Sequence, residues 1–180
     1  MIYFSIPWDT KKNLGRYYNQ FLSILPNAND FACFIDGDAN FTTTFFGKQL
    51  EDIIAKHPEC GIFTAYASRI GCSWQQKGSW ESDDMLLHRE IGKLLADTQY
   101  DEIEDHSHIG NENQMGGVLM LIRKSSWEHC GKFNEQGILG IDNDFHRKAE
   151  AWDEKVYLMK GVYLYHYYRM GKKHDKTHLQ

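Results

Sequence analysis

The chain contains the stretch Phe31-Ala32-Cys33-Phe34-Ile35-Asp36-Gly37-Asp38, in which an uninterrupted apolar run ends in two aspartates. An apolar run without polar alternation is typical of a central β-strand that is covered on both faces. Ligands of open α/β sheets bind beyond the carboxyl ends of the strands, which is where Asp36 and Asp38 would lie. The stretch therefore predicts a buried strand with a binding site at its end.

Strand-like and helix-like segments alternate along the rest of the chain. Runs typical of strands cover residues 2–6, 61–67, 118–122, 156–159 and 162–167. Apolar residues at helical spacing cover residues 14–25, 46–54 and 83–96, and two more helices are expected to begin near Ser125 and Asp142. Residues 98–114 are polar and are expected to form a loop. The alternation predicts an α/β fold, with one three-layer domain and a mostly parallel mixed sheet over residues 1–168 and a basic tail over residues 169–180.

The composition narrows the class of protein. A chain of 180 residues with 42% hydrophobic residues suits one well-filled domain. The net charge is −5, and lysine and arginine concentrate only between Arg169 and Lys176, so no nucleic-acid partner is expected. This tail is expected to be a solvated terminus, and contact with an anionic membrane surface stays open as the alternative.

Cysteines and apolar segments bear on the cell compartment. The four cysteines show no CxxC pair, which favours buried free thiols in a reducing compartment. The sequence has no run of about 18 apolar residues, and its first residues lack the pattern of a signal peptide. We therefore expect a cytoplasmic protein without a transmembrane segment.

The acidic pair after the first buried strand is a candidate metal site. Two carboxylates that flank a glycine can face one hard cation, Mn²⁺ or Mg²⁺, if Gly37 lets the chain turn sharply. Such a cation would neutralise a diphosphate. The alternative is a polar turn after a strand, because aspartate and glycine are common turn formers.

A second acidic pair, Asp142 and Asp144, stands at the predicted start of a helix. Acidic residues in a first turn suit the helix dipole, so capping explains the pair without any catalytic role. A carboxylate held at a helix start is also a good general base for an acceptor hydroxyl. Both roles can hold together, and Asp142 and Asp144 are the candidate catalytic residues.

His166 ends the last predicted strand and is the third candidate ligand of the metal. A neutral imidazole beside Asp38 would complete the site, and nitrogen ligation favours Mn²⁺ over Mg²⁺. The alternative is a packed core histidine. We expect the side chains of Asp38 and His166 to approach closely enough to share one cation, with Arg169 available to phosphate oxygens.

Taken in order along the chain, these motifs resemble the small GT-A glycosyltransferases related to family two, of the kind found in phage and bacterial polysaccharide loci. The resemblance spans nearly the whole chain and rests on Ile6-Pro7, Lys12-Asn13-Leu14-Gly15, Phe34-Ile35-Asp36-Gly37-Asp38, Gly116-Gly117, Asp142-Asn143-Asp144 and Gly161 to His166.

The resemblance implies a GT-A, Rossmann-like fold, a nucleotide-sugar donor, a metal on Asp36, Asp38 and His166, and a base at Asp142. The resemblance, together with positions along the chain, suggests a set of residues for binding the donor. They are Ile6, Pro7, Lys12, Asn13, Arg16, Asp36, Gly117 and Arg169. One departure is that larger relatives insert a further strand and helix before the segment that contains Asn13. That segment helps to hold the nucleotide base, so the base preference stays undetermined here.

The leading hypothesis is therefore a metal-dependent glycosyltransferase that moves a sugar from a nucleotide-sugar donor to an acceptor hydroxyl of a glycan, a lipid-linked sugar or a protein. Two alternatives stay open. The first is a non-catalytic homologue that binds a nucleotide sugar or a carbohydrate. The second is a metal-dependent nucleotidyltransferase, which would need a better phosphate-binding loop than residues 11–16 offer. The sequence leaves open the sugar, the acceptor, the stereochemical outcome and the oligomeric state.

Overall fold

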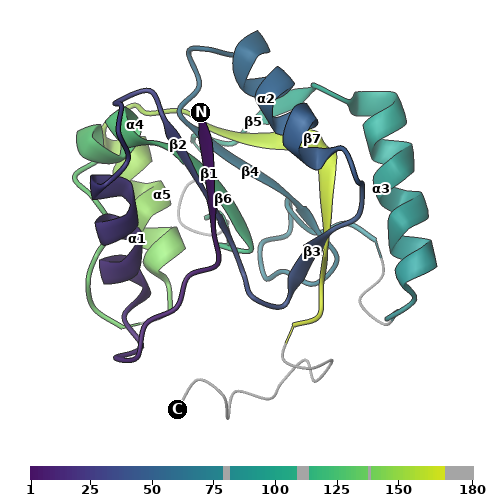
Figure 1. Ribbon diagram of the computed structural model, residues 1–180, viewed down its shortest axis with the longest axis horizontal. Coiled ribbons are helices and arrows are strands. Elements are labelled where there is room, and N and C mark those ends of the chain that lie inside the picture. The colour runs from purple at the N-terminus through teal and green to yellow at the C-terminus, as the bar shows by residue number, and fades with distance from the viewer. Residues whose placement is uncertain (79–81, 109–113, 138, 169–180) are drawn as a thin grey trace.

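The computed structural model describes residues 1–78, 82–108, 114–137 and 139–168. These residues form an α/β domain in which strands and helices follow one another along the chain (Figure 1). The strands are β1 (Ile2–Ser5), β2 (Phe31–Ile35), β3 (Ala39–Phe41), β4 (Ile62–Ala67), β5 (Ile103–Asp105), β6 (Leu119–Arg123) and β7 (Val156–His166). The helices are α1 (Leu14–Ser23), α2 (Phe46–Lys56), α3 (Met85–Gln99), α4 (Lys124–His129) and α5 (Ile141–Ala151).

The described strands form one mixed sheet in the order β1-β2-β6-β4-β7-β3, and β5 also pairs with β7. The pairs β1/β2 and β4/β7 are parallel, whereas β6 runs antiparallel to both β2 and β4. Strands β1, β2, β4 and β7 consequently share one direction, and their carboxyl ends meet at one edge of the sheet. The structure thus confirms an α/β domain with a mixed sheet.

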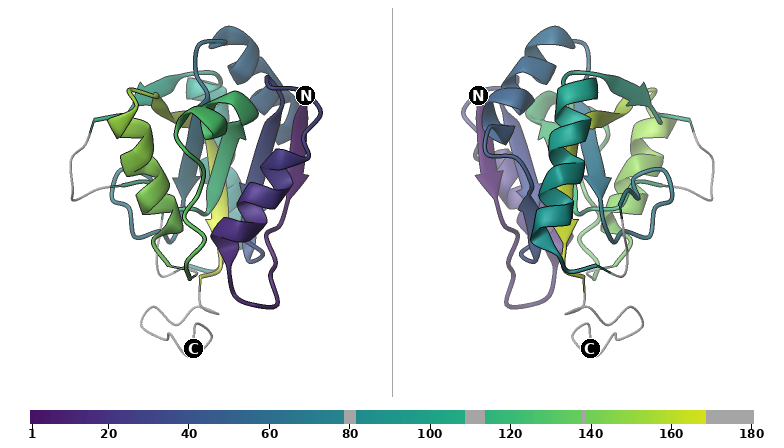
Figure 2. Two further views of the ribbon diagram at one scale, coloured as in Figure 1. Left: turned by 90° about the vertical axis from the view of Figure 1, so that its left-hand side faces the viewer. Right: turned by 90° about the vertical axis from the view of Figure 1, so that its right-hand side faces the viewer.

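Helices cover the sheet on both sides, which gives the predicted three layers (Figure 2). Helices α1, α4 and α5 lie on one side, and α2 and α3 lie on the other (Figure 1). Within β2, Ala32 and Phe34 belong to the core beneath α1 and α5, whereas Phe31 and Cys33 belong to the core beneath α2. This is why the run is apolar at every position: each face of the strand packs against a different helical layer.

The last strand and the polar segment 98–114 differ from the sequence-based expectations, and the short strand β3 was not expected. Residues 156–159 and 162–167 were expected to form separate strands, but β7 is one strand whose pairing with β4 shifts between Ala65 and Tyr66. Gly161 lies at this irregularity, where an added Cβ would come within 2.4 Å of the Gln99 carbonyl oxygen. The polar segment 98–114, expected to be a loop, contributes β5, because its backbone pairs with β7. Polar composition alone does not reveal such an edge strand.

Hydrogen bonds join helix α1 to the segment that leads to α5. The Asn19 side-chain amide donates to the Phe133 carbonyl, and the Asn13 amide donates to the Glu135 carbonyl. Gly15 lies at the same contact, where an added Cβ would be 1.7 Å from the Asn134 carbonyl oxygen. A glycine is required there by close approach of two backbones.

Replacement of Gly15 by alanine is therefore expected to lower the free energy of unfolding by about 3 kcal/mol, because backbone must move to admit the methyl group. Gly47 is the matched control, since it also lies near the start of a helix and has nothing within 4 Å of its Cβ position. Gly47→Ala is expected to be neutral or stabilising by up to about 1 kcal/mol. Urea unfolding of both variants measures this, and equal stabilities would contradict the tight contact.

Candidate metal centre

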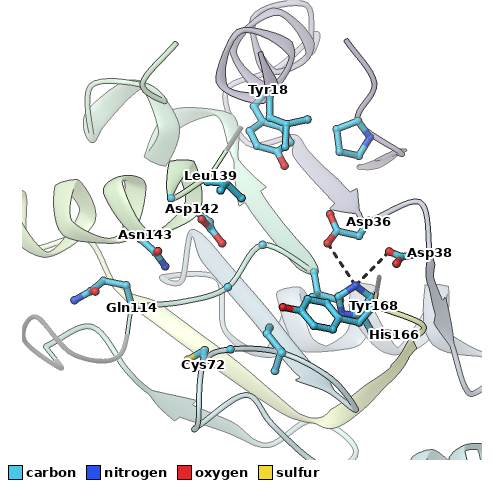
Figure 3. A pocket seen from close by; sticks show the side chains of 18 of the residues that line it. Tyr18, Asp36, Asp38, Cys72, Gln114, Leu139, Asp142, Asn143, His166 and Tyr168 are labelled. Carbon is cyan, nitrogen blue, oxygen red and sulfur yellow. Dashed lines mark ion pairs between the residues drawn. The ribbon is translucent and has the colours of Figure 1, made fainter. Parts of the chain in front are cut away.

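A cleft of about 750 Å³ opens where β1, β2, β4 and β7 end and where β6 begins (Figure 3). Its position agrees with the general rule that α/β sheets bind ligands beyond the carboxyl ends of their strands. Carboxylates, amides and apolar groups share its wall. The lining residues are Pro7, Trp8, Asp9, Lys12, Leu14, Tyr18, Asp36, Asp38, Arg69, Ile70, Gly71, Cys72, Gln114, Gly116, Gly117, Val118, Leu139, Gly140, Asp142, Asn143, His166 and Tyr168.

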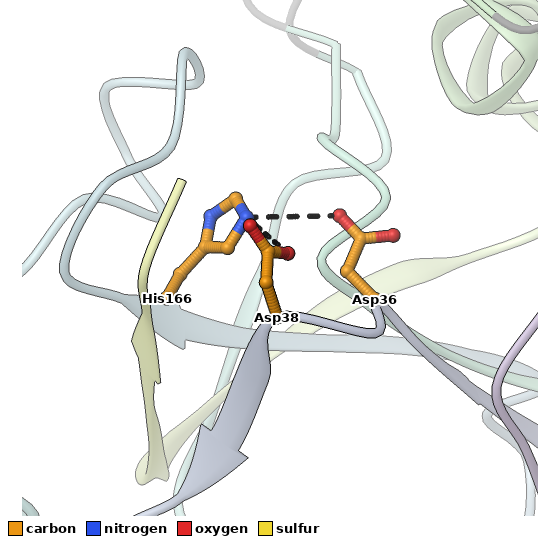
Figure 4. A group of neighbouring side chains, drawn as sticks. All are labelled: Asp36, Asp38 and His166. Carbon is orange, nitrogen blue, oxygen red and sulfur yellow. Dashed lines mark ion pairs between the residues drawn. The ribbon is translucent and has the colours of Figure 1, made fainter. Parts of the chain in front are cut away.

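Asp36, Asp38 and His166 converge at one side of this cleft (Figure 4). The Nε2 atom of His166 lies 3.2 Å from Asp38 Oδ1 and 3.9 Å from Asp36 Oδ2. One ligand atom from each of the three residues lies within 4.8 Å of the others, a spacing that suits a single cation. In the described part of the chain, no other group of histidine, cysteine, aspartate or glutamate residues has this geometry.

The pairing of β3 with β7 creates this convergence. Ala39 of β3 is in register with His166 of β7, and the backbone N–H of Tyr167 donates to the Asp38 carbonyl at 2.9 Å. The short strand β3 thus folds the acidic pair back against the end of β7. The prediction that Asp38 and His166 lie close enough to share one cation is confirmed in its geometry.

The hydrogen bonds of His166 determine which ring nitrogen faces the carboxylates. Nδ1 lies 2.6 Å from the carbonyl oxygen of Arg69. A carbonyl only accepts, so Nδ1 must donate, and Nε2 is the nitrogen that faces the carboxylates; Nε2 donates to Asp38 when it is protonated and offers a lone pair to a cation when it is not. Metal-bound histidines in proteins usually have this second hydrogen bond, which fixes the tautomer. The imidazole is buried and hydrogen-bonded, as the alternative interpretation expected, and its Nε2 also faces two carboxylates at the cleft.

The two aspartates differ in proton affinity. Burial, together with the nearby charges of Asp38 and Asp142, raises the pKa of Asp36 to about 6, although His166 opposes this shift. The hydrogen bond from His166 lowers the pKa of Asp38 below its usual value. Without a cation, the negative charge of Asp36 is unfavourable because it is buried and repelled by the carboxylates of Asp38 and Asp142. A divalent ion between the carboxylates would offset this repulsion.

Asp36→Asn is expected to stabilise the metal-free protein at neutral pH. A carboxyl group whose pKa is raised on folding favours the folded state only at low pH, and that contribution is lost as the pH rises through about 6. Asparagine keeps the shape without the charge. Thermal unfolding in EDTA should show little difference between variant and wild type near pH 4 and a more stable variant near pH 7.5. Parallel pH profiles would contradict a perturbed Asp36.

Gly37 lies in the sharp turn expected from the sequence, but the turn does not use the conformational freedom of glycine. It is not among the described glycines with a positive φ, and an added Cβ would lie 3.5 Å from the Ile6 side chain, an ordinary contact. The turn is closed by a hydrogen bond from the Ala39 N–H to the Asp36 carbonyl. The expected sharp turn is therefore present, but a turn of this kind accepts most residues at its centre and does not depend on a glycine.

Asp142 lines the cleft from the helical side, across from Asp36 (Figure 3). It lies in the first turn of α5, after Gly140, which adopts a left-handed conformation with φ 72°. Burial raises the pKa of Asp142, although backbone hydrogen bonds from Asn143 and Gly117 oppose the shift. Asp142 is therefore a carboxylate with enhanced proton affinity that faces the same cleft as Asp36, Asp38 and His166.

Asp144, the other candidate catalytic carboxylate, is placed differently. Its Oδ2 lies 3.1 Å from Lys148 Nζ, one helical turn further along α5, and it is not a lining residue of the cleft. Its position suits the first-turn electrostatic role that the sequence also allowed. Of the two aspartates, Asp142 is the one that lines the cleft.

The donor-binding candidates separate into two groups. Pro7, Lys12, Asp36 and Gly117 line the cleft, and Lys12 does so from a left-handed backbone conformation with φ 51°. The other candidates do not line the cleft. The Asn13 side chain caps α1, Arg16 makes an ion pair with Asp9, and Ile6 is largely exposed. Arg169 and the rest of the predicted tail 169–180 lie outside the described residues.

Several cleft residues were missed by sequence reasoning. They are Tyr18, Arg69, Cys72, Gln114, Asn143 and Tyr168. Arg69 and Cys72 follow the buried strand β4 as the acidic pair follows β2, so the strand-end rule could have found them. Tyr18 was assigned to the apolar face of its helix. It packs there, and burial with the charges of Asp36 and Asp142 strongly raises its pKa.

Comparison with known proteins gave no assignment: no family model matches the chain, and no curated protein matches it.

The four cysteines are free and buried, as predicted. No helix in the described part of the chain has both the length and the apolar character needed to cross a bilayer.

Proposed function

We propose that this protein is a metal-dependent glycosyltransferase that uses a nucleotide-sugar donor, a member of the GT-A type related to family two. The observation that carries the proposal is that one cleft has Asp36, Asp38 and His166, three residues that could hold a cation, on one side and Asp142 on the other. Glycosyl transfer needs both parts. The departing diphosphate requires positive charge, and the acceptor hydroxyl requires a base.

Asp36, Asp38 and His166 would hold the cation, Mn²⁺ or Mg²⁺. The bound ion would neutralise the negative charge that develops on the departing nucleoside diphosphate. Lys12 lines the same cleft and adds a positive side chain from the loop after β1. Its φ of 51° is uncommon for a residue with a side chain, and such conformations are concentrated at functional sites.

Asp142 would take the proton from the acceptor hydroxyl. The efficiency of a general base increases as its pKa approaches the working pH, and burial shifts the pKa of Asp142 in that direction. The acceptor would be a hydroxyl of a glycan, a lipid-linked sugar or a protein. A base opposite the metal group suits direct displacement, which inverts the anomeric centre.

The products that are released distinguish this proposal from the two alternatives. A non-catalytic homologue would bind a nucleotide sugar in the presence of Mn²⁺ but release nothing. A nucleotidyltransferase would release pyrophosphate, whereas a glycosyltransferase releases a nucleoside diphosphate. Chromatography distinguishes the three when a panel of nucleotide sugars is incubated with a panel of acceptors and, in parallel, a panel of nucleoside triphosphates is incubated with sugar phosphates, because only a nucleoside triphosphate can supply the pyrophosphate.

Calorimetric titration with nucleoside diphosphates, with and without Mn²⁺, tests the donor part of the proposal. We expect at least one nucleoside diphosphate to bind with Mn²⁺ present and to bind much more weakly in EDTA. The same titration with Asp38→Ala shows whether the effect depends on the acidic pair. Absence of binding for every base with Mn²⁺ present would overturn the proposed function.

A further inference from the structure

The segment that follows β4 contacts both the backbone and the imidazole ring of His166. The backbone N–H of His166 donates to Ser68 Oγ at 3.0 Å, and the His166 imidazole donates through Nδ1 to the Arg69 carbonyl at 2.6 Å. Ser68 also donates its backbone N–H to the Leu164 carbonyl at 3.1 Å. Two consecutive residues thus hold both the backbone and the ring of the candidate metal ligand.

The side chain of Arg69 anchors this segment. Its guanidinium donates to the Tyr167 carbonyl at 3.0 Å and to the Ser82 carbonyl at 3.1 Å, and it lies 2.7 Å from Asp83 Oδ1. Only 5% of the Arg69 side chain is exposed, so these contacts satisfy a buried charge. One buried cation therefore connects the residue after His166 to the segment that precedes α3.

Asp83 completes the arrangement from the surface. Its Oδ1 also accepts a hydrogen bond from the Tyr165 hydroxyl at 2.7 Å, although 58% of the Asp83 side chain is exposed. Tyr165 belongs to β7, so the Asp83 carboxylate links the guanidinium to the same strand that ends in His166. The guanidinium also lies over the Tyr165 ring, 5.8 Å from its centroid.

We propose that Arg69, held by Asp83, is a positioning residue for His166, because its buried guanidinium fixes the backbone carbonyl that keeps the proton on Nδ1 and directs Nε2 at Asp36 and Asp38. This inference rests on the proposed function in so far as Nε2 ligates a metal. Arg69 acts on the ring through its own backbone carbonyl, which accepts the hydrogen bond from Nδ1. Loss of a hydrogen bond of this kind behind a metal-bound histidine typically lowers metal affinity 10- to 100-fold.

Arg69→Met tests the inference, since methionine fills space without donating hydrogen bonds. The Mn²⁺ dissociation constant, measured by calorimetry, should rise about 10- to 100-fold. Arg123→Met is the matched control: Arg123 donates to the Pro58 and Cys60 carbonyls and lies over the Phe31 ring, at the end of β2 away from the cleft. The control should lose comparable stability and keep the Mn²⁺ affinity of the wild type.

Asp83→Asn serves if Arg69→Met does not fold, because Asp83 is largely exposed and asparagine still accepts a hydrogen bond from Tyr165. A smaller loss, about 3- to 10-fold in Mn²⁺ affinity, is expected, since the guanidinium loses its charged partner but keeps two carbonyls. Unchanged affinity in both Arg69→Met and Asp83→Asn would overturn the positioning role and leave the metal site intact.

The ¹⁵N chemical shifts of the His166 ring in metal-free protein give a readout that does not depend on the metal. Wild type should have Nδ1 protonated, whether or not Nε2 also donates to Asp38, and Arg69→Met should populate the form in which Nδ1 has lost its proton and Nε2 keeps one. Wild-type protein with Nε2 protonated and Nδ1 bare would overturn the inference. If wild type binds no Mn²⁺ yet shows the expected tautomer and its change, the proposed function fails while Arg69 still positions the ring.

Discussion

Asp142→Asn is expected to reduce the rate of sugar transfer about 10²- to 10⁴-fold, the range that a positioned general base contributes. Asparagine matches the shape of aspartate but does not accept the hydroxyl proton. Because burial raises the pKa of Asp142, removal of its charge should leave the fold at least as stable as wild type at neutral pH. Binding of a nucleoside diphosphate with Mn²⁺ should persist, since the three metal-site residues are unchanged.

The comparison with Asp144→Asn makes this test specific. Both aspartates lie in the first turn of α5, but Asp142 lines the cleft and Asp144 pairs with Lys148. A smaller loss of turnover is therefore expected for Asp144→Asn. Turnover is measured as release of nucleoside diphosphate from the nucleotide sugar. If Asp142→Asn keeps full turnover, Asp142 is not the base and the catalytic proposal loses its second part.

Mn²⁺ is expected to raise the melting temperature of the wild-type protein, and Asp38→Ala and His166→Ala should abolish the rise. A ligand at about 100 times its dissociation constant stabilises the folded state by about 2.7 kcal/mol. For a domain of this size, that corresponds to an increase of roughly 5–10 °C. Thermal unfolding with and without Mn²⁺, started from protein treated with EDTA, measures the difference.

His108→Ala is the matched control for the metal experiment. His108 also faces two carboxylates, but Glu150 lies near its Nδ1 at 3.7 Å and Asp153 near its Nε2 at 3.6 Å, so the two acids do not face the same nitrogen. The His108 side chain is also half exposed. This variant should respond to Mn²⁺ as the wild type does. An equal rise in melting temperature in wild type and His166→Ala would exclude His166 as a ligand.

Local patterns were sufficient to predict most of the helices and strands. Strand β2 and the position of Asp36 and Asp38 after it follow from an apolar run that ends abruptly in charge. Helix α5 was expected to begin near Asp142, and it does. The edge strands β3 and β5 were not predicted, because three residues each of mixed polarity carry no periodic signal and are strands only through pairing with β7.

The candidate site was predicted in part. Asp36, Asp38 and His166 were expected to converge, and they do. The residues alone did not separate Asp142 from Asp144, and only the resemblance favoured Asp142. Residues two positions apart on a helix point in nearly opposite directions, about 200° around its axis, so only one of them can face a given cleft. Which one does so depends on how α5 packs against the sheet. Sequence spacing does not contain that information.

The sequence by itself determined which residues are acidic at the end of a buried strand and which histidine ends the last strand, since both follow from hydrophobic patterning along the chain. Only the tertiary structure decided that Asp38 and His166 are neighbours, because the pairing of β3 with β7 joins residues far apart in sequence. It also decided which imidazole nitrogen faces the carboxylates, since that depends on a carbonyl contributed by the loop after β4.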